Sequence, residues 1–151
     1  MKKDASGNIY LGGKFDGTID FDPGPGVFNM SGPAGTGTGF FVKLDPFGNF
    51  LLARSIITST IINTRGSTYL EVDPAGNVYA SGVFGGTTDM DPGAGTFNLT
   101  AQGSSDVYFL KLDTNGNFVF AQRMGSTGTA DYVNDMSFTL PVYPFHQKLQ
   151  T

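Results

Sequence analysis

The chain has 151 residues, of which 39% are hydrophobic and 15% charged, and its formal net charge is −4. This is the length of one domain, and the acidic balance excludes a nucleic-acid-binding protein, which would need a basic surface. The absence of cysteine excludes a disulfide framework, a thiolate zinc site and a cysteine nucleophile, and no apolar run is long enough for a membrane-spanning helix.

The composition predicts an all-β protein. The chain contains 22 glycines and 8 prolines, and 12 of its 13 acidic residues are aspartate, which favours turns, rather than glutamate, which favours helices. The 14 phenylalanines and 6 tyrosines argue against disorder, since a disordered chain lacks such aromatic area. We therefore expect strands joined by tight turns.

A five-residue motif, Asp-x-x-Gly-Asn, recurs along the chain. It spans Asp4–Asn8, Asp45–Asn49, Asp73–Asn77 and Asp113–Asn117. Aspartate at the first position and glycine at the fourth are typical of a type I turn, and a glycine in the left-handed region then closes a β-hairpin. A helix N-cap at each aspartate is the weaker alternative, because glycine and asparagine follow where helix-forming residues should stand.

The segments that flank these turns have the β-branched and aromatic composition of strands. In chain order the predicted strands are Ile9–Leu11, Phe40–Leu44, Phe50–Ala53, Tyr69–Val72, Val78–Ala80, Val107–Leu112 and Phe118–Ala121. The stretch Asn49–Arg65, with two isoleucine pairs, also favours strand over helix. Because Val107–Leu110 is apolar on both faces, its sheet should be covered on both sides.

The chain contains an internal repeat of about 69 residues. Residues 4–30 align with 73–99 at an offset of 69, with 15 identities in 27 positions, and residues 41–54 align with 109–122 at an offset of 68, with 8 identities in 14. Each period holds four predicted strands and a longer connection, Asp-x-Asp-Pro-Gly-x-Gly, between the second and the third. A four-stranded antiparallel meander that repeats is typical of β-propeller blades, and a repeated β-solenoid or sandwich is the alternative.

The repeat divides the chain into four parts. We expect residues 1–66 to form a partial first blade without its first strand, residues 67–130 a second blade, and residues 131–139 the first strand of a third blade. Residues 140–151 no longer follow the pattern. A propeller closes with about four to eight blades, so two blades make an incomplete ring. The sequence therefore predicts a fragment of a longer propeller, or a chain that assembles with copies of itself.

Three longer motifs resemble the SBBP-type bacterial β-propeller repeat in its long form. They are D-x-x-G-N-[IV]-Y at Asp4–Tyr10 and Asp73–Tyr79, F-x-G-T-x-D-x-D-P-G-x-G at Phe15–Gly26 and Phe84–Gly95, and F-x-K-L-D-x-x-G-N-F at Phe41–Phe50 and Phe109–Phe118. The resemblance covers roughly residues 4–138 and implies a repetitive, non-catalytic propeller outside the cell or at the cell surface. Leu52 and Phe120 depart from the family pattern, which often carries tryptophan at this position.

The candidate site residues are two pairs of aspartates, Asp20 with Asp22 and Asp89 with Asp91. Residues two apart on a strand point to one face, so each pair would present two carboxylates side by side, and oxygen ligands of this kind suit calcium. The alternative is that these aspartates shape their loops through side-chain-to-backbone hydrogen bonds. Catalysis by the same carboxylates is the weaker hypothesis, because a glycosidase needs two acids that face each other across its substrate.

The remaining candidates have structural interpretations beside the functional ones. Tyr10, Tyr79 and Tyr108 either line a sugar-binding groove or pack between blades, and packing is favoured. His146 is the only histidine and lies in the part that leaves the repeat, so neither a catalytic base nor a zinc site is expected. The glycine pairs lie between strands with no helix after them, which favours turns over phosphate-binding loops.

The sequence therefore predicts a non-catalytic, extracellular or cell-surface module that binds a partner or serves as a scaffold. The alternative is a calcium-dependent or glycan-binding module that uses the Asp-x-Asp loops, and a hydrolase comes third. The expected partners are a protein or glycan ligand and further propeller blades or copies of the chain, with no nucleic acid, no membrane span and no required cofactor. No secretory signal peptide is expected, because Met1-Lys2-Lys3 runs into polar residues.

Overall fold

The structure, a computed structural model, describes residues 1–33, 35, 37–57, 68–128, 130, 131, 133 and 135–137. Within these residues every regular element is a β-strand, and every strand pair is antiparallel. A helix long and apolar enough to cross a membrane is not found in this part of the chain. The prediction of an all-β protein with antiparallel sheets is confirmed.

The first sheet has four strands in the order β1-β2-β5-β6. They are β1 (Lys2–Lys3), β2 (Ile9–Phe15), β5 (Thr38–Leu44) and β6 (Phe50–Ile57). Strand β1 is only two residues long, but it occupies the place of the first strand that the sequence analysis expects to be missing. The Asp-x-x-Gly-Asn turns at Asp4 and Asp45 connect β1 to β2 and β5 to β6, as predicted.

The second sheet repeats this arrangement in the order β7-β8-β11-β12. Its strands are β7 (Tyr69–Val72), β8 (Val78–Phe84), β11 (Asp106–Leu112) and β12 (Phe118–Met124). The pairing register is also repeated, since Lys2 lies opposite Tyr10 in the first sheet and Glu71 lies opposite Tyr79 in the second. Both sheets carry a register shift near the end of their third strand. The internal repeat thus produces two sheets of the same strand order and register.

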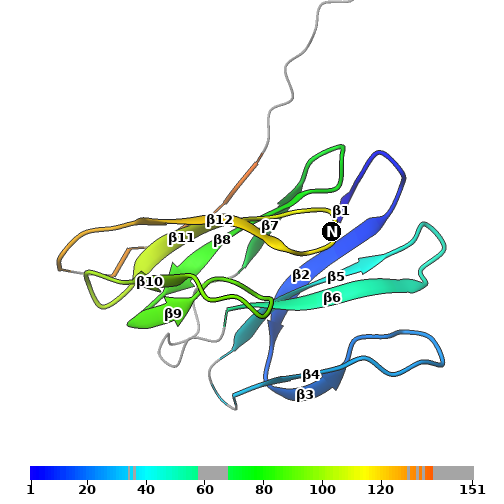
Figure 1. Ribbon diagram of the computed structural model, residues 1–151, viewed down its shortest axis with the longest axis horizontal. Helices are drawn as coiled ribbons and strands as arrows, with labels where there is room; N and C mark the ends of the chain where they lie inside the picture. The colour runs from blue at the N-terminus through cyan, green and yellow to red at the C-terminus, as the bar shows by residue number, and fades with distance from the viewer. Residues whose placement is uncertain are drawn as a thin grey trace, which may run out of the picture.

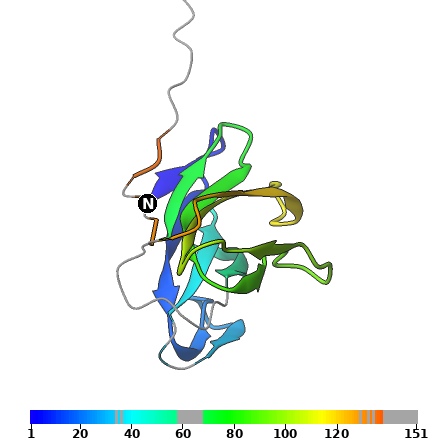
Figure 2. The same cartoon turned by 90° about the vertical axis from the view of Figure 1, so that its left-hand side faces the viewer.

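Each unit also carries a small two-stranded ribbon between its second and third sheet strands. The ribbons consist of β3 (Gly17–Asp20) with β4 (Asn29–Gly32), and of β9 (Thr87–Asp89) with β10 (Asn98–Thr100). Both stretches are predicted as connections without strands, because the four ribbon strands are short and mostly polar. Ribbon β3–β4 lies on the side of the first sheet that faces away from the second sheet (Figures 1 and 2). There Phe21 packs on Phe15 and Phe40, with ring centroids 5.1 and 4.8 Å apart.

The faces of the two sheets can be compared directly because their registers match. The front face of each sheet is defined as the face that carries Tyr10 in the first sheet and Tyr79 in the second sheet. The back face is the opposite one, which carries Ile9 in the first sheet and Val78 in the second sheet. Side chains alternate between these faces along each strand. The front face of the first sheet covers the back face of the second, so the two sheets pack front to back.

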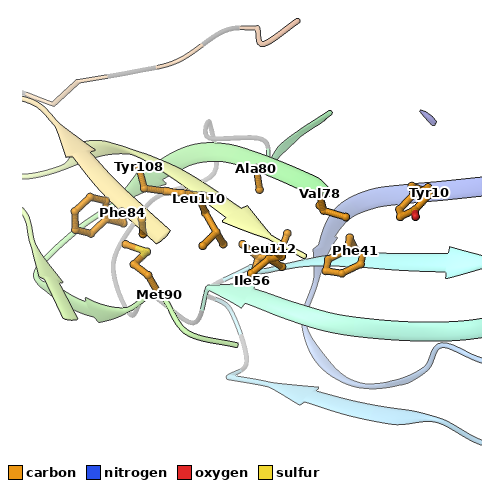
Figure 3. Packing of buried hydrophobic residues seen from close by; sticks show 11 residues of the cluster. Tyr10, Phe41, Ile56, Val78, Ala80, Phe84, Met90, Tyr108, Leu110 and Leu112 are labelled. Atoms are coloured by element: carbon orange, nitrogen blue, oxygen red, sulfur yellow. The ribbon is translucent and has the colours of Figure 1, made fainter. Parts of the chain in front are cut away.

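The hydrophobic core lies between these two faces (Figure 3). The first sheet contributes Tyr10, Phe41 and Ile56, each at most 1% exposed. The second unit contributes Val78, Ala80, Phe84, Met90, Tyr108, Leu110, Leu112 and Ala121. Burial of this apolar surface holds the two sheets together. Because one cluster spans both sheets, the two repeats form one packed body.

Three sequence-based predictions fall wholly or partly outside the described residues. They concern residues 58–67 of the isoleucine-rich stretch, residues 131–139 as the opening of a third blade, and residues 140–151 with His146. In the second of these segments the structure describes Asp131, Val133 and 135–137, which are not in a strand. The third blade stays a prediction.

Candidate functional site

The four Asp-x-x-Gly-Asn turns are closed by one set of hydrogen bonds, of which the Asp45 turn is an example. The Gly48 N–H donates to the Asp45 carbonyl oxygen at 3.1 Å, and the Asn49 N–H and Nδ2 donate to the two carboxylate oxygens of Asp45 at 2.9 and 2.7 Å. The same bonds recur in the other three turns. Each turn glycine has a positive φ, between 76° and 92°. Both oxygens of each turn aspartate are therefore used by the turn itself.

These hydrogen bonds lower the pKa of the turn aspartates. At Asp45 the side-chain amide of Asn49 is the largest cause of the lowered pKa. At Asp4, Asp73 and Asp113, burial opposes the effect, and hydrogen bonds from the following asparagine and from backbone N–H groups outweigh it and lower the pKa. The turn carboxylates are thus held in the ionised form, which suits an acceptor of hydrogen bonds and not a proton donor.

The first predicted site, Asp20 with Asp22, is part of a closed loop. Strand β3 ends at Asp20, so Asp22 lies beyond the strand, and the two residues do not form the strand pair on which the calcium prediction is based. Asp20 Oδ1 accepts the N–H groups of Asp22 at 3.0 Å and Phe28 at 2.8 Å. Asp22 Oδ1 accepts the N–H of Gly24 at 2.7 Å. These are the side-chain-to-backbone bonds that the loop-shaping alternative predicts.

The second predicted site, Asp89 with Asp91, has the same geometry. Asp89 Oδ1 accepts the N–H groups of Asp91 at 3.0 Å and Phe97 at 2.8 Å, and Asp91 Oδ1 accepts that of Gly93 at 2.7 Å. The structure therefore keeps each pair together, with one oxygen of each aspartate bonded to the backbone of its own loop. In the described part of the chain no three His, Cys, Asp or Glu side chains gather as a metal-binding group. Calcium at these aspartates stays a prediction.

The last glycine of each loop approaches the carboxylate closely. A Cβ at Gly26 would lie 2.2 Å from Asp22 Oδ2, and a Cβ at Gly95 would lie 2.2 Å from Asp91 Oδ2. Real Cβ atoms do not come this close to an oxygen, so any other residue would displace the aspartate. The last glycine of each Pro-Gly-x-Gly sequence is thus explained by the space that the carboxylate occupies.

A surface hollow of about 400 Å³ lies beside the first loop. One part of its lining is the Pro23–Gly26 stretch with Asp22, and the other is Gly48, Asn49 and Phe50. A carboxylate, an amide and an aromatic ring thus line one depression between the Asp-x-Asp loop and the Asp45 turn. Asp22 is a predicted site residue, whereas the contribution of the Asp45 turn has no signal in the sequence, because the two segments are brought together only in the folded chain.

Two of the three candidate tyrosines, Tyr10 and Tyr108, occupy packing positions. Tyr10 is fully buried between the sheets, where its hydroxyl donates toward Asp4 Oδ2 at 3.1 Å and the Gly76 carbonyl oxygen at 3.3 Å. Burial and the Asp4 carboxylate raise its pKa. Tyr108 is 2% exposed, and burial raises its pKa to about 12. Neither ring has surface left for a sugar, whereas Tyr79 is half-buried on the front face of the second sheet.

The ion pair between Asp106 and Arg123 is buried and is not predicted from the sequence. Asp106 is 0% exposed, and its Oδ2 accepts a hydrogen bond from Arg123 Nη1 at 2.6 Å and from the Gln102 N–H at 2.9 Å. The Gln102 N–H is the largest cause of its lowered pKa, and Arg123 adds to it against the effect of burial. The aligned residues of the first unit are Thr38 and Ser55, so the repeat carries no signal for this pair.

A scan against models of protein families and a search of curated proteins both find no match to this chain.

Proposed function

We propose that the chain is a non-catalytic β-propeller segment that acts as a binding or structural module, and that its two sheets are consecutive blades. The observation that carries this proposal is the front-to-back packing of two sheets with the same strand order and register. In such packing one rotation relates each sheet to the next, which is the arrangement of blades around a propeller axis. A two-layer sandwich needs no such relation between its sheets.

The state of the carboxyl groups supports a role without catalysis. A general acid needs a carboxyl whose pKa is raised toward neutrality. The pKa is lowered at Asp106 and at the turn aspartates Asp4, Asp45, Asp73 and Asp113. The aspartates of both Asp-x-Asp loops are hydrogen-bonded to their own backbone. The hydrogen bonds of these carboxylates therefore stabilise the turns and loops of the fold.

The non-catalytic role is tested by turnover measurements. Purified chain is incubated with panels of glycosidase, peptidase and esterase substrates, with calcium and with a chelator. We expect no turnover above that of buffer under either condition. Turnover that persists with the chelator and scales with protein concentration would contradict the proposal.

The location outside the cell comes from the resemblance to SBBP-type repeats. It is tested with antibodies against the purified chain, applied to intact and to permeabilised cells of the source organism. Staining of intact cells is expected. Staining that requires permeabilisation would overturn the location and leave the scaffold role untouched.

A second candidate function, calcium-dependent or glycan binding, is favoured by the hollow beside the first loop. Its lining combines the Asp22 carboxylate with the Asn49 amide and the Phe50 ring, which are groups that bind sugar hydroxyls and sugar faces. Calorimetry with calcium chloride and a glycan array test this function directly. Asp22→Asn should remove the signal, whereas Asp91→Asn, in the second loop, should retain it. If neither heat nor array signal is found, this candidate is wrong.

A further inference from the structure

We propose that a second copy of this chain docks the back face of its first sheet onto the front face of the second sheet, so that copies assemble head to tail. The proposal rests on the blade arrangement described above. The interface between copies would repeat the front-to-back interface that already joins the two sheets within one chain. Both halves of that interface are present a second time in the molecule, at aligned positions and on faces that the other four-stranded sheet does not cover. Ribbon β3–β4 covers part of the back face of the first sheet, where Phe15, Val42 and Ala53 are buried, and the docking surface is the remaining part around Leu11 and Leu44.

The back face of the first sheet is open where the aligned face of the second sheet is covered. Ala80 and Leu112 are 0% exposed, because the first sheet packs on them. The aligned residues are Leu11, which is 38% exposed, and Leu44, which is half-buried. Ala80 and Leu112 thus lie under a neighbouring four-stranded sheet, whereas Leu11 and Leu44 do not.

The front face of the second sheet is more exposed than the aligned front face of the first sheet. Phe41 and Ile56 of the first sheet are each 1% exposed in the core between the sheets. Their aligned residues are Phe109, which is half-buried, and Met124, which is 53% exposed. This face carries the same large apolar side chains that the first sheet buries against its neighbour.

A polar contact of the internal interface can also be repeated. Lys43 Nζ donates to the Thr114 carbonyl oxygen at 3.4 Å, and so joins the first sheet to a turn of the second. The aligned residues are Lys111 and Pro46, so Lys111 would reach the Pro46 carbonyl oxygen of the second copy. Both lysines already have the same position over the ring of a neighbouring tyrosine, at 5.3 and 5.0 Å from its centroid.

The charges at the first strand of each sheet are complementary in the repeated interface. Lys2 Nζ forms an ion pair with Glu71 Oε1 within the chain. These two residues are aligned with each other in the repeat, so the interface between copies would place Glu71 next to Lys2 of the second copy. Along a head-to-tail assembly of copies, lysine and glutamate thus alternate from sheet to sheet at this position, so that two like charges are never adjacent.

An interface between two different faces is heterologous, and it forms a ring if the rotation closes and a filament if it does not. A closed propeller contains about four to eight sheets, which corresponds to about two to four copies of this chain. The ring of two to four copies is the closed outcome of this docking, and masses that keep rising beyond it would identify a filament instead.

The first experiment is sedimentation equilibrium of the purified full chain over a hundredfold range of concentration. We expect masses that are whole multiples of the monomer, rising to two to four copies. A monomer across the whole range would overturn the inference, but it would leave the proposed blade arrangement and scaffold role standing.

The second experiment blocks one face at a time. Leu11→Lys places a charge on the back face of the first sheet, and Met124→Lys places one on the front face of the second. Val27→Lys is the matched control, since Val27 is 72% exposed on the loop between β3 and β4. Each face variant alone should lose assembly, and the control should assemble like the unmodified chain. Circular dichroism verifies that all three variants are folded, and a variant that fails this check is replaced by Ile9→Lys or Phe120→Lys.

Mixing the two face variants identifies which faces meet. Each variant retains the face that the other lacks, so an equal mixture should form a one-to-one dimer through the two intact faces. Assembly by either variant alone, or a mixture that remains monomeric, would contradict head-to-tail docking.

Discussion

The glycines of the Asp-x-x-Gly-Asn turns share a left-handed backbone but differ in their surroundings. At Gly48, with φ +90°, a Cβ would meet no atom within 4 Å, whereas at Gly76, with φ +92°, it would lie 2.9 Å from the Tyr10 hydroxyl oxygen. We predict that Gly48→Ala lowers the free energy of unfolding by about 1–2 kcal/mol, the strain of a side chain in this region. Gly76→Ala should cost about 1–3 kcal/mol more, because it displaces Tyr10 from the interface between the sheets. Urea unfolding measures both variants, and equal losses would contradict the close approach at Gly76.

The turn aspartates make the stability of the chain dependent on pH at the acidic end. Their pKa in the folded chain lies below the unfolded value of about 3.9, so the stability that they contribute is complete above that value and is lost as the pH falls through the folded pKa. We predict a constant urea midpoint from pH 7 to about pH 5 and a decrease below about pH 4. Asp73→Asn keeps an acceptor oxygen but removes the charge, so the decrease should become shallower. An unchanged slope would show that Asp73 does not contribute.

At the scale of the elements, ribbon β3–β4 acts as a cover for part of the first sheet. Phe21, which follows β3, packs on the rings of Phe15 and Phe40. We predict that Phe21→Ala lowers the free energy of unfolding by about 2–3 kcal/mol, less than for a fully buried phenylalanine because Phe21 is half-buried. Val27→Ala in the same loop should change it by no more than about 0.5 kcal/mol, since Val27 is exposed. Thermal and urea unfolding distinguish the two, and similar losses would mean that the ribbon does not stabilise the sheet.

In the whole molecule, the hydrophobic core between the two sheets joins the two repeats. Phe41 is 1% exposed and contacts a cluster made mostly of residues from the second sheet. We predict that Phe41→Ala lowers the free energy of unfolding by about 3–5 kcal/mol and that both sheets still unfold in one transition. Circular dichroism and tyrosine fluorescence should give coincident curves. Two separate transitions in the unmodified chain would show that the sheets are independent and would contradict a common core.

The features that depend on local chemistry could be predicted from the amino-acid sequence. The turns follow from aspartate, glycine and asparagine at fixed positions, because one aspartate side chain binds the backbone four residues on and glycine accepts the positive φ. The all-β class and the two copies of the unit follow from composition and from the alignment of residues 4–30 with 73–99. The Asp-x-Asp loops were also identified, with the loop-shaping bonds among the alternatives.

Which sheet faces and which distant side chains contact each other could not be predicted, because these contacts form only in the folded chain. Ribbon strands β3 and β4 are too short and polar to show a period, and they form because the sheet brings their ends together. The Asp106–Arg123 pair joins neighbouring strands and has no counterpart in the first unit. Two sheets with identical registers can pack front to front or front to back. The choice depends on which pair of faces has side chains that fill the space between the sheets. The sequence of one strand does not show this, because it depends on the side chains of the neighbouring sheet.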